Sequence, residues 1–201
     1  MHKKIRYIYK HFLAIIWKGT IMSNICLSGG AEGADTWWTK EAKKNGHEVI
    51  NFTFRNHGSR CSNLQVLNEK ELAKADEALH RANLSMKRTF PTKDAKTNNL
   101  LRRNYYQIMD SEALYAITTI TKGQVDGGTG WAVNMFIDRM VIDKVPDLKC
   151  YVFDQKQRQW FQYVNGWVKI EKPEIPCGRY TGIGARDILE SGIKAIQKVY
   201  Q

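Results

Sequence analysis

The sequence predicts an α/β domain in which helices flank a mostly parallel sheet and a β-hairpin lies in the C-terminal third. Two observations carry this prediction. An apolar strand, a glycine-rich turn and an amphipathic helix follow one another from residue 24 onward, and the same order returns about a hundred residues later. Strands that alternate with helices are typical of a parallel sheet, because each crossover helix covers a face of that sheet.

The first turn follows an apolar strand at residues 25–27 and leads into a helix from about Gly33. Glycines allow a sharp turn and a close approach of the backbone to a ligand, and the N–H groups at a helix start attract anions. A bound phosphate is therefore one interpretation of this turn, and plain packing of a helix on a strand is the other. The apolar residues of the helix share one face: Ala34, Trp37, Trp38 and Ala42.

The second turn follows a predicted buried strand at residues 113–120 and contains Gly127, Gly128 and Gly130. The next helix repeats the apolar spacing of the first, with Ala132, Met135, Phe136 and Met140 inward. Two such turns should lie together at the carboxyl edge of one parallel sheet, where open α/β folds bind ligands. The repetition favours a binding site over two structural turns.

The segments between the two turns predict further elements. Residues 47–54 read as a strand, and the basic loop 55–60 contacts either phosphate and ribose or only solvent. Helical spacing over residues 64–84 predicts one packing helix, and residues 88–98 predict a loop. A helix over residues 99–110 carries Arg102 and Arg103 on its polar side, as phosphate contacts or as an ordinary solvated face.

The C-terminal third predicts a buried strand at residues 149–154 and a hairpin over residues 160–170, with Asn165 and Gly166 in its turn. Residues 179–184 contain Gly182 and Gly184 and read as a third, weaker glycine turn. They lead into a last helix over residues 187–200.

Composition sets the domain organisation. Of the net charge of +11, five positive charges and no acid lie in residues 1–22, which leaves +6 on the rest of the 201-residue chain. We expect one domain over residues 23–201, preceded by a basic and apolar extension. This extension is either a membrane-surface or targeting helix or a dispensable piece before Met22, and its apolar run is too short to span a bilayer.

Cysteine and histidine spacing bears on the compartment and on metal binding. The four cysteines lack CxxC pairs and the five histidines lack metal-ligand spacing. We therefore expect reduced thiols in a cytoplasmic protein, with no metal and no cofactor.

The two motifs SGGAEGAD and DGGTGWAV together resemble the SLOG superfamily of Rossmann-like proteins, which includes the DNA-processing protein A and LONELY GUY families. The further segments LLRRNYYQI, YVFDQ and TGIGARDI are similar to an uncharacterised subgroup from phages and bacteria. The resemblance covers roughly residues 24–201. It implies a Rossmann-like fold and a nucleotide-derived ligand.

The LONELY GUY branch cleaves a base from ribose with a glutamate in a GGxGTxxE loop. In this chain Trp131 stands at the threonine position of that loop and Asn134 at the glutamate position. An amide cannot exchange a proton as a carboxylate does, so this resemblance argues against that hydrolase mechanism. A glycosidic hydrolase that uses Glu32 or Asp126 stays open as an alternative.

The preferred hypothesis is a pocket between the two loops for ADP-ribose or a related signal nucleotide, in a sensor or sequestering protein, with phage counter-defence as one setting. Asp35 or Asp126 would accept from ribose, and Trp37 or Trp131 would stack on the base or simply pack. Single-stranded DNA bound on a basic face is the rival partner, and we expect a homo-oligomer with no membrane contact. The expected ligand-binding residues are Ser28, Gly29, Gly30, Gly33, Asp35, Arg102, Arg103, Asp126, Gly127, Gly128, Thr129, Gly130 and Trp131.

Overall fold

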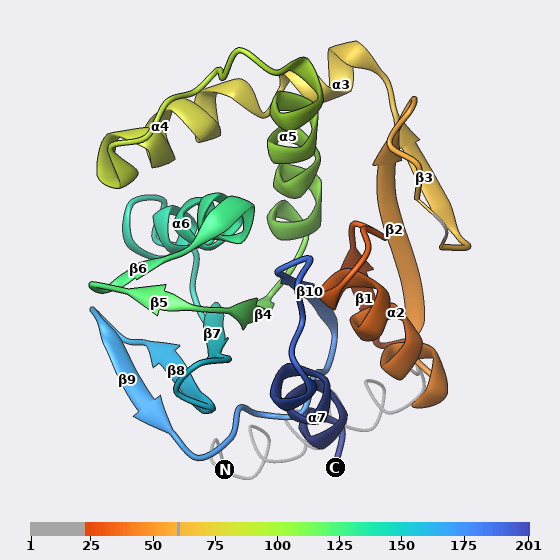
Figure 1. Ribbon diagram of the computed structural model, residues 1–201, viewed down its shortest axis with the longest axis vertical. Coiled ribbons are helices and arrows are strands. Elements are labelled where there is room, and N and C mark those ends of the chain that lie inside the picture. The colour runs from red at the N-terminus through yellow and green to blue at the C-terminus, as the bar shows by residue number, and fades with distance from the viewer. Residues whose placement is uncertain (1–22, 60) are drawn as a thin grey trace, which may run out of the picture.

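The computed structural model describes residues 23–59 and 61–201, so the prediction for the N-terminal extension lies outside the described residues. An eight-stranded sheet runs through the described part in the order β3-β2-β1-β10-β4-β7-β8-β9 (Figure 1). The first six strands of this order are parallel, and β8 and β9 are antiparallel. The predicted α/β fold with a C-terminal hairpin is confirmed.

Six strands make up the parallel part of the sheet, and two more form the hairpin after β7. A separate two-stranded hairpin, β5 and β6, follows β4. In chain order the strands are β1 (Ile25–Ser28), β2 (Glu48–Phe54), β3 (Leu64–Leu67), β4 (Ala113–Thr118), β5 (Ile120–Thr121), β6 (Gln124–Val125), β7 (Lys149–Asp154), β8 (Gln159–Tyr163), β9 (Trp167–Ile170) and β10 (Arg179–Gly184).

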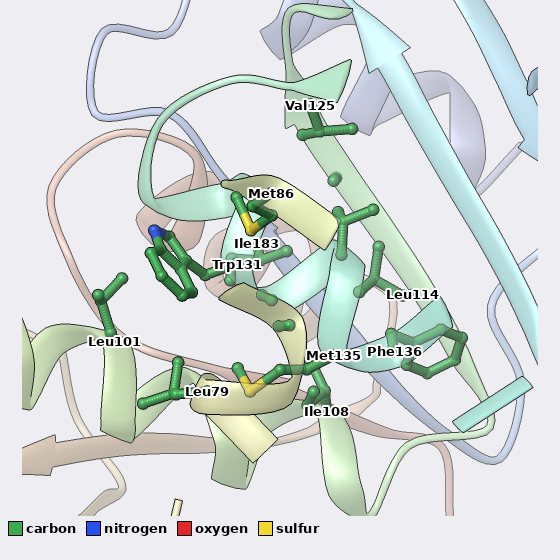
Figure 2. Close-up of a cluster of buried hydrophobic side chains, with 14 of the residues drawn as sticks. Leu79, Met86, Leu101, Ile108, Leu114, Val125, Trp131, Met135, Phe136 and Ile183 are labelled. Atoms are coloured by element: carbon green, nitrogen blue, oxygen red, sulfur yellow. The ribbon is translucent and has the colours of Figure 1, made fainter. Parts of the chain in front are cut away.

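Helices cover both faces of the sheet. One face packs against α2 and α7 around buried Trp38 and Ile196, and the other packs against α5 and α6 around Ile108 and Phe136. Figure 2 shows part of the second cluster, in which Leu79 and Met86 of α4 lie over α6. In chain order the helices are α2 (Ala34–Lys44), α3 (Glu69–Ala73), α4 (Asp76–Met86), α5 (Ala95–Met109), α6 (Gly127–Val141) and α7 (Glu190–Val199).

The prediction of one helix over residues 64–84 is wrong. Its first four residues form β3, which pairs in parallel with residues 51–54 of β2, and its remainder is split between α3 and α4. Asn68 ends the strand with a capping box: its side chain accepts from the Glu71 N–H, and the Glu71 carboxylate accepts from the Asn68 N–H. An Asn-x-x-Glu signature therefore starts the helix five residues after the position that apolar spacing suggested.

The third glycine turn is also wrong, because residues 179–184 form the strand β10, which lies between β1 and β4 in the sheet. Both glycines are needed for close packing on α2. A Cβ on Gly182 would lie 2.4 Å from Cγ of Trp38, and one on Gly184 would lie 2.6 Å from Cβ of Ala34. The glycines read as turn residues are contact points between a strand and a helix.

No helix within residues 23–59 and 61–201 has both the length and the apolar character required to span a membrane.

Candidate functional site

Both glycine loops lie at the carboxyl edge of the parallel sheet. The first follows β1 and leads into α2, and the second follows β4, passes through the β5–β6 hairpin and leads into α6 (Figure 1). The end of β10 lies between them, because β10 pairs with both β1 and β4. The sequence placed the loops at one edge, and the structure adds the strand that separates them.

The first loop is buried under the side chain of Arg103 from α5. A Cβ on Gly29 would lie 0.9 Å from Arg103 Nη1, so only glycine leaves room for the guanidinium. With the Gln107 amide oriented by its hydrogen bonds, its oxygen accepts from Arg103 Nη1 at 2.9 Å and from the Gly29 N–H. The Gly29 N–H is therefore already bonded, and the space that we expected a phosphate to fill holds an arginine.

Arg103 forms a buried ion pair with Asp35 of α2. Arg103 Nη1 donates to Asp35 Oδ2 at 3.2 Å, and the two side chains are only 5% and 4% exposed. Burial raises the pKa of Asp35 and lowers that of Arg103, and the attraction between the two charges opposes both shifts. Asp35 is thus a buried partner of Arg103, a different place from the ribose contact that we expected for it.

Two further segments close over the first loop. Ser59 of the β2–β3 loop donates its hydroxyl to the Gly30 carbonyl at 3.0 Å. A Cβ on Gly33, whose φ is +99°, would lie 2.3 Å from the carbonyl oxygen of Arg186 in the β10–α7 turn. The backbone of this loop therefore contacts three other parts of the chain at close range.

The pKa of His57 is lowered partly by positively charged residues nearby. His57 Nδ1 hydrogen-bonds the Thr53 hydroxyl at 2.9 Å, and the ring stacks on Phe54. Burial and the positive charges of Arg103, Lys96 and Arg186 lower the pKa of His57 to about 4. The ring is therefore neutral at pH 7 and lies in a positive field.

The second loop is open where the first is closed. Gly127 and Gly128 are exposed; a Cβ on Gly127 would have no neighbour within 4 Å, and one on Gly128 would meet only Leu101, at 4.0 Å. Asp126 precedes α6 but makes no side-chain cap; its carboxylate accepts from the hydroxyls of Thr119 and Thr121 at 2.6 and 2.8 Å. These hydrogen bonds lower the pKa of Asp126. The first N–H groups of α6 therefore start the helix without a side-chain acceptor.

Helix α5 connects the two loops through adjacent residues. Arg103 contacts the first loop, and the Asn104 side-chain amide is 3.5 Å from the Gly128 carbonyl oxygen in the second. Both side chains are buried, and each leaves one polar atom without a hydrogen-bond partner: Nε of Arg103 and Oδ1 of Asn104. Unpartnered polar atoms in buried positions are costly, and within the described residues Trp38, Arg81 and Asp138 each hold one more. The two on α5 are the ones that lie between the glycine loops, so they are the candidate ligand contacts of this edge.

Four of the other expected site residues have structural contacts of their own. The Ser28 hydroxyl donates to the carbonyls of Asp35 and Gly182, and Arg102 forms an ion pair with Asp76 on α4 at 2.6 Å. Thr129 is buried, and a Cβ on Gly130 would lie 2.2 Å from the Val125 carbonyl oxygen. These contacts account for the four residues without a ligand.

Trp131 packs in the hydrophobic cluster of α4, α5 and α6 (Figure 2). It is 4% exposed, and its ring centroid is 6.0 Å from that of Phe90. Packing is therefore the contact that the structure shows for Trp131, and whether its indole also stacks on a base stays a prediction.

The sequence analysis missed five polar residues at this edge. Lys96 was missed because the predicted helix began at residue 99, whereas α5 begins at Ala95. With the correct start, the seven-residue spacing places Lys96 on the same helix face as Arg103. Arg88 donates to the Gly127 carbonyl at 2.7 Å and comes from a segment read only as a loop. The missed residues are Arg88, Lys96, Asn104, Gln107 and Arg186.

A cavity of about 920 Å³ lies apart from the first loop, between the β7–β8 turn and the start of α7. Its lining includes Trp160 and Leu189 with the side chains of Lys156 and Lys198. It contains none of the buried, unpartnered polar atoms found on α5, so we place the candidate site at the glycine loops. Within the described residues, no group of three His, Cys, Asp or Glu side chains is arranged to hold a metal ion.

No protein-family model, no curated protein and no solved structure matches this chain.

Proposed function

We propose that the protein binds a small nucleotide-derived ligand, of ADP-ribose or related type, at the edge where the two glycine loops meet α5. The observation that carries the proposal is the pair Arg103 and Asn104. These adjacent buried residues reach one loop each and leave one polar atom each without a partner. A ligand with phosphate and hydroxyl groups would supply the missing acceptor and donor.

The second loop is the better place for a phosphate. Gly127 and Gly128 are exposed with open space beside them, and α6 begins there without a side-chain cap. The helix dipole and the unbonded N–H groups favour an anion at this point. Arg88 and Lys156 add positive charge near Asp126. At the first loop, the ligand would meet Arg103 of α5, which Asp35 and Gln107 hold in place, and not the N–H groups of the loop.

The surroundings of Asn134, Asp35 and Asp126 favour binding of the ligand without its hydrolysis. Asn134, at the position of the LONELY GUY glutamate, donates to the Gly130 carbonyl at 2.8 Å, so it serves as a structural amide. Asp35 is buried in its ion pair, and Asp126 is bonded to two threonine hydroxyls. A general base needs a carboxylate that readily takes a proton. The ion pair occupies Asp35, and the threonine hydroxyls lower the pKa of Asp126, which makes its carboxylate a weaker base. We therefore propose a sensor or a sequestering protein.

Mass spectrometry of nucleotides that co-purify with the protein tests the proposal directly. Thermal shifts with AMP, NAD, ADP-ribose and cyclic ADP-ribose then rank the ligands, since a ligand that binds only the folded state raises Tm. The variant Gly128→Asp should abolish the shift, because it puts a negative charge where the phosphate would lie. It should fold, because a Cβ at this position has only Leu101 near it, at 4.0 Å.

Gly46→Asp is the matched control. Gly46 follows α2 at the opposite edge of the sheet and has no atom within 4 Å of a Cβ. Its φ of +77° is one that L residues rarely adopt, so the variant should melt below the wild type without ligand, and only the shift caused by the ligand is compared. This variant should keep the ligand shift. Wild-type affinity in a folded Gly128→Asp variant would contradict the proposal, and release of free base from the bound nucleotide would show turnover in place of binding.

A further inference from the structure

The cavity of about 920 Å³ lies where the sheet extends past α7. Helix α7 packs on β4 and β7, and the sheet continues beyond β7 through β8 and β9. On the face toward α7, Phe153 of β7 lies opposite Trp160 of β8, and Trp160 lies opposite Ile170 of β9. These three side chains form an apolar row across the strands, and the cavity lies between part of this row and the helix.

One side of α7 forms a wall of the cavity. Four of its residues, at spacings of three and four, line it: Ser191, Lys194, Ala195 and Lys198. The sheet contributes Phe153 and Trp160, which are largely buried and whose ring centroids are 5.3 Å apart. The cavity therefore combines an aromatic floor with a helical wall that carries two lysines.

Positive charge prevails in the lining, which holds two carboxylates and five cations: Lys156, Arg158, Lys172, Lys194 and Lys198. Within the described residues, only Lys194 pairs with a carboxylate, that of Glu190, at 2.7 Å. This leaves four cations against the single carboxylate of Glu171. Asp154 and Asp187 adjoin the lining, and the cations still outnumber the acids when both are counted.

The neutral polar side chains of the lining serve the fold. The Gln155 amide accepts from the Leu189 N–H at 2.7 Å and donates to the Asp187 carbonyl at 3.3 Å. The Gln159 amide donates to two backbone carbonyls at 3.1 and 2.6 Å. The donors left for a ligand are therefore mainly those of the cations.

We propose that this cavity binds a small organic anion, with an apolar body against Phe153 and Trp160 and an acidic group among the cations. The volume lies in the range of about 300 to 1,000 Å³ that is typical of sites for small molecules. Residues 1–22 carry five positive charges and no acid, so they do not complement this lining. The site goes beyond the proposed nucleotide pocket and does not depend on it.

Two fluorescent probes that differ by one charge test the proposal on the full chain at pH 7.5. Both 1-anilinonaphthalene-8-sulfonate and N-phenyl-1-naphthylamine emit more strongly in apolar surroundings, and only the first carries a sulfonate. The sulfonate probe should bind more tightly than the neutral probe by roughly fivefold or more, because several cations act on it. Added salt should reduce this advantage.

Removal of charge should act on the sulfonate probe alone. The double variant Lys172→Gln, Lys198→Gln should weaken its binding by about threefold to tenfold and leave the neutral probe unchanged. Lys70→Gln is the matched control, since Lys70 is an exposed lysine on α3, which follows β3 at the other end of the sheet. All three lysines are exposed, so these variants should fold as the wild type does.

Removal of apolar surface should act on both probes. Leu189 lines the cavity at the N-cap of α7, where serine is a favoured residue, so Leu189→Ser should weaken both probes without loss of the helix. Leu84→Ser, at an exposed position of α4, is the control and should change neither.

Displacement of the sulfonate probe by naphthalene-1-carboxylate or by dodecanoate would support the site and show whether its ligand has an aromatic or an aliphatic body. Equal affinity for the two probes, or an equal loss in Lys70→Gln, would overturn it. Absence of any gain in emission would also overturn it, and is the result expected if another part of the chain or a second copy fills the cavity.

The nucleotide pocket is tested separately. Displacement of the sulfonate probe by AMP or ADP-ribose would place the probe at the glycine loops and overturn the separate site. The double variant Lys172→Gln, Lys198→Gln should keep every thermal shift that nucleotides cause in the wild type, because neither lysine belongs to the proposed pocket. Loss of those shifts would show that the two sites are one.

Discussion

Arg103 is the residue on which the geometry of this edge depends most. Its guanidinium fills the space over Gly29 and pairs with Asp35. The side chain is only 5% exposed, so almost none of it contacts water. A buried charge of this kind is stable only with its partner in place. The same partner fixes the direction of the guanidinium, so in the proposed pocket Asp35 would affect a ligand only through Arg103.

Replacement of Asp35 by asparagine should destabilise the fold by about 3 to 5 kcal/mol, because it leaves the buried Arg103 charge uncompensated. Chemical denaturation measures this change in the free energy of unfolding. Glu190→Gln provides the comparison: Glu190 pairs with Lys194 on the surface, where the side chains are 80% and 63% exposed, and such exposed pairs contribute little to stability. Similar losses in the two variants would mean that the Asp35 pair is not buried.

His57 gives the fold a pH dependence of defined sign. Burial and the cations Arg103, Lys96 and Arg186 lower its pKa to about 4 in the folded chain, against an ordinary value of 6.5. The unfolded chain therefore binds more protons between these two values, and His57 lowers stability as the pH falls from about 6.5 to about 4. Melting temperatures at pH 7 and pH 5 should differ less in His57→Gln than in the wild type. An equal difference in both proteins would contradict this assignment.

At the scale of single elements, the start of α6 combines an open surface with a tight contact. Gly127 and Gly128 face open space, whereas Gly130, in the same first turn, lies against the Val125 carbonyl at the end of β6. The fold therefore leaves room for a side chain at Gly127 and Gly128 but not at Gly130. Only the tight one is required by the fold.

Gly130→Ala should destabilise the protein strongly, because its Cβ would lie 2.2 Å from a backbone oxygen that cannot move without β6. Gly128→Ala should be neutral or stabilising by up to about 1 kcal/mol, since alanine is the better helix former. Thermal melting of the two variants side by side measures the difference. Equal melting temperatures would show that α6 can shift away from β6.

At the scale of the whole molecule, charge is the property that bears on partners. The chain carries a net charge of +11, a value that fits nucleic-acid binding as well as a nucleotide site. In the described part, the cations that we assign to the site gather at one edge of the sheet, around two loops. Such a compact arrangement fits a small ligand better than a long strand.

Fluorescence titration with thymine oligomers of several lengths at two salt concentrations separates the two partners. A compact site should give weak binding that does not grow with oligomer length. A surface that follows a nucleic-acid backbone releases counterions, so its affinity rises with length and falls steeply with salt. Tight, length-dependent binding would favour the DNA-processing role over the proposed one.

The sequence by itself determined the α/β class, both glycine loops and the C-terminal hairpin. These features are local: strand, turn and helix signals lie within about ten residues of one another, as in Asn165 and Gly166 between β8 and β9. Where local signals competed, the prediction was wrong. Residues 64–67 follow helical spacing, but they are fixed as β3 by pairing with β2, and the capping box at Asn68 starts the helix only afterwards.

Only the tertiary structure decided where distant segments meet. The placement of β10 between β1 and β4 joins residues more than sixty positions apart in the chain. The same sheet order brings Arg103 against Gly29 and Arg186 against Gly33. Sequence patterns carry the period of a helix or a strand, but they do not state which side chain fills the space beside a glycine, because that depends on packing between elements. The sequence therefore predicted the glycine turn, but it did not predict that Arg103, paired with Asp35, fills the space beside Gly29.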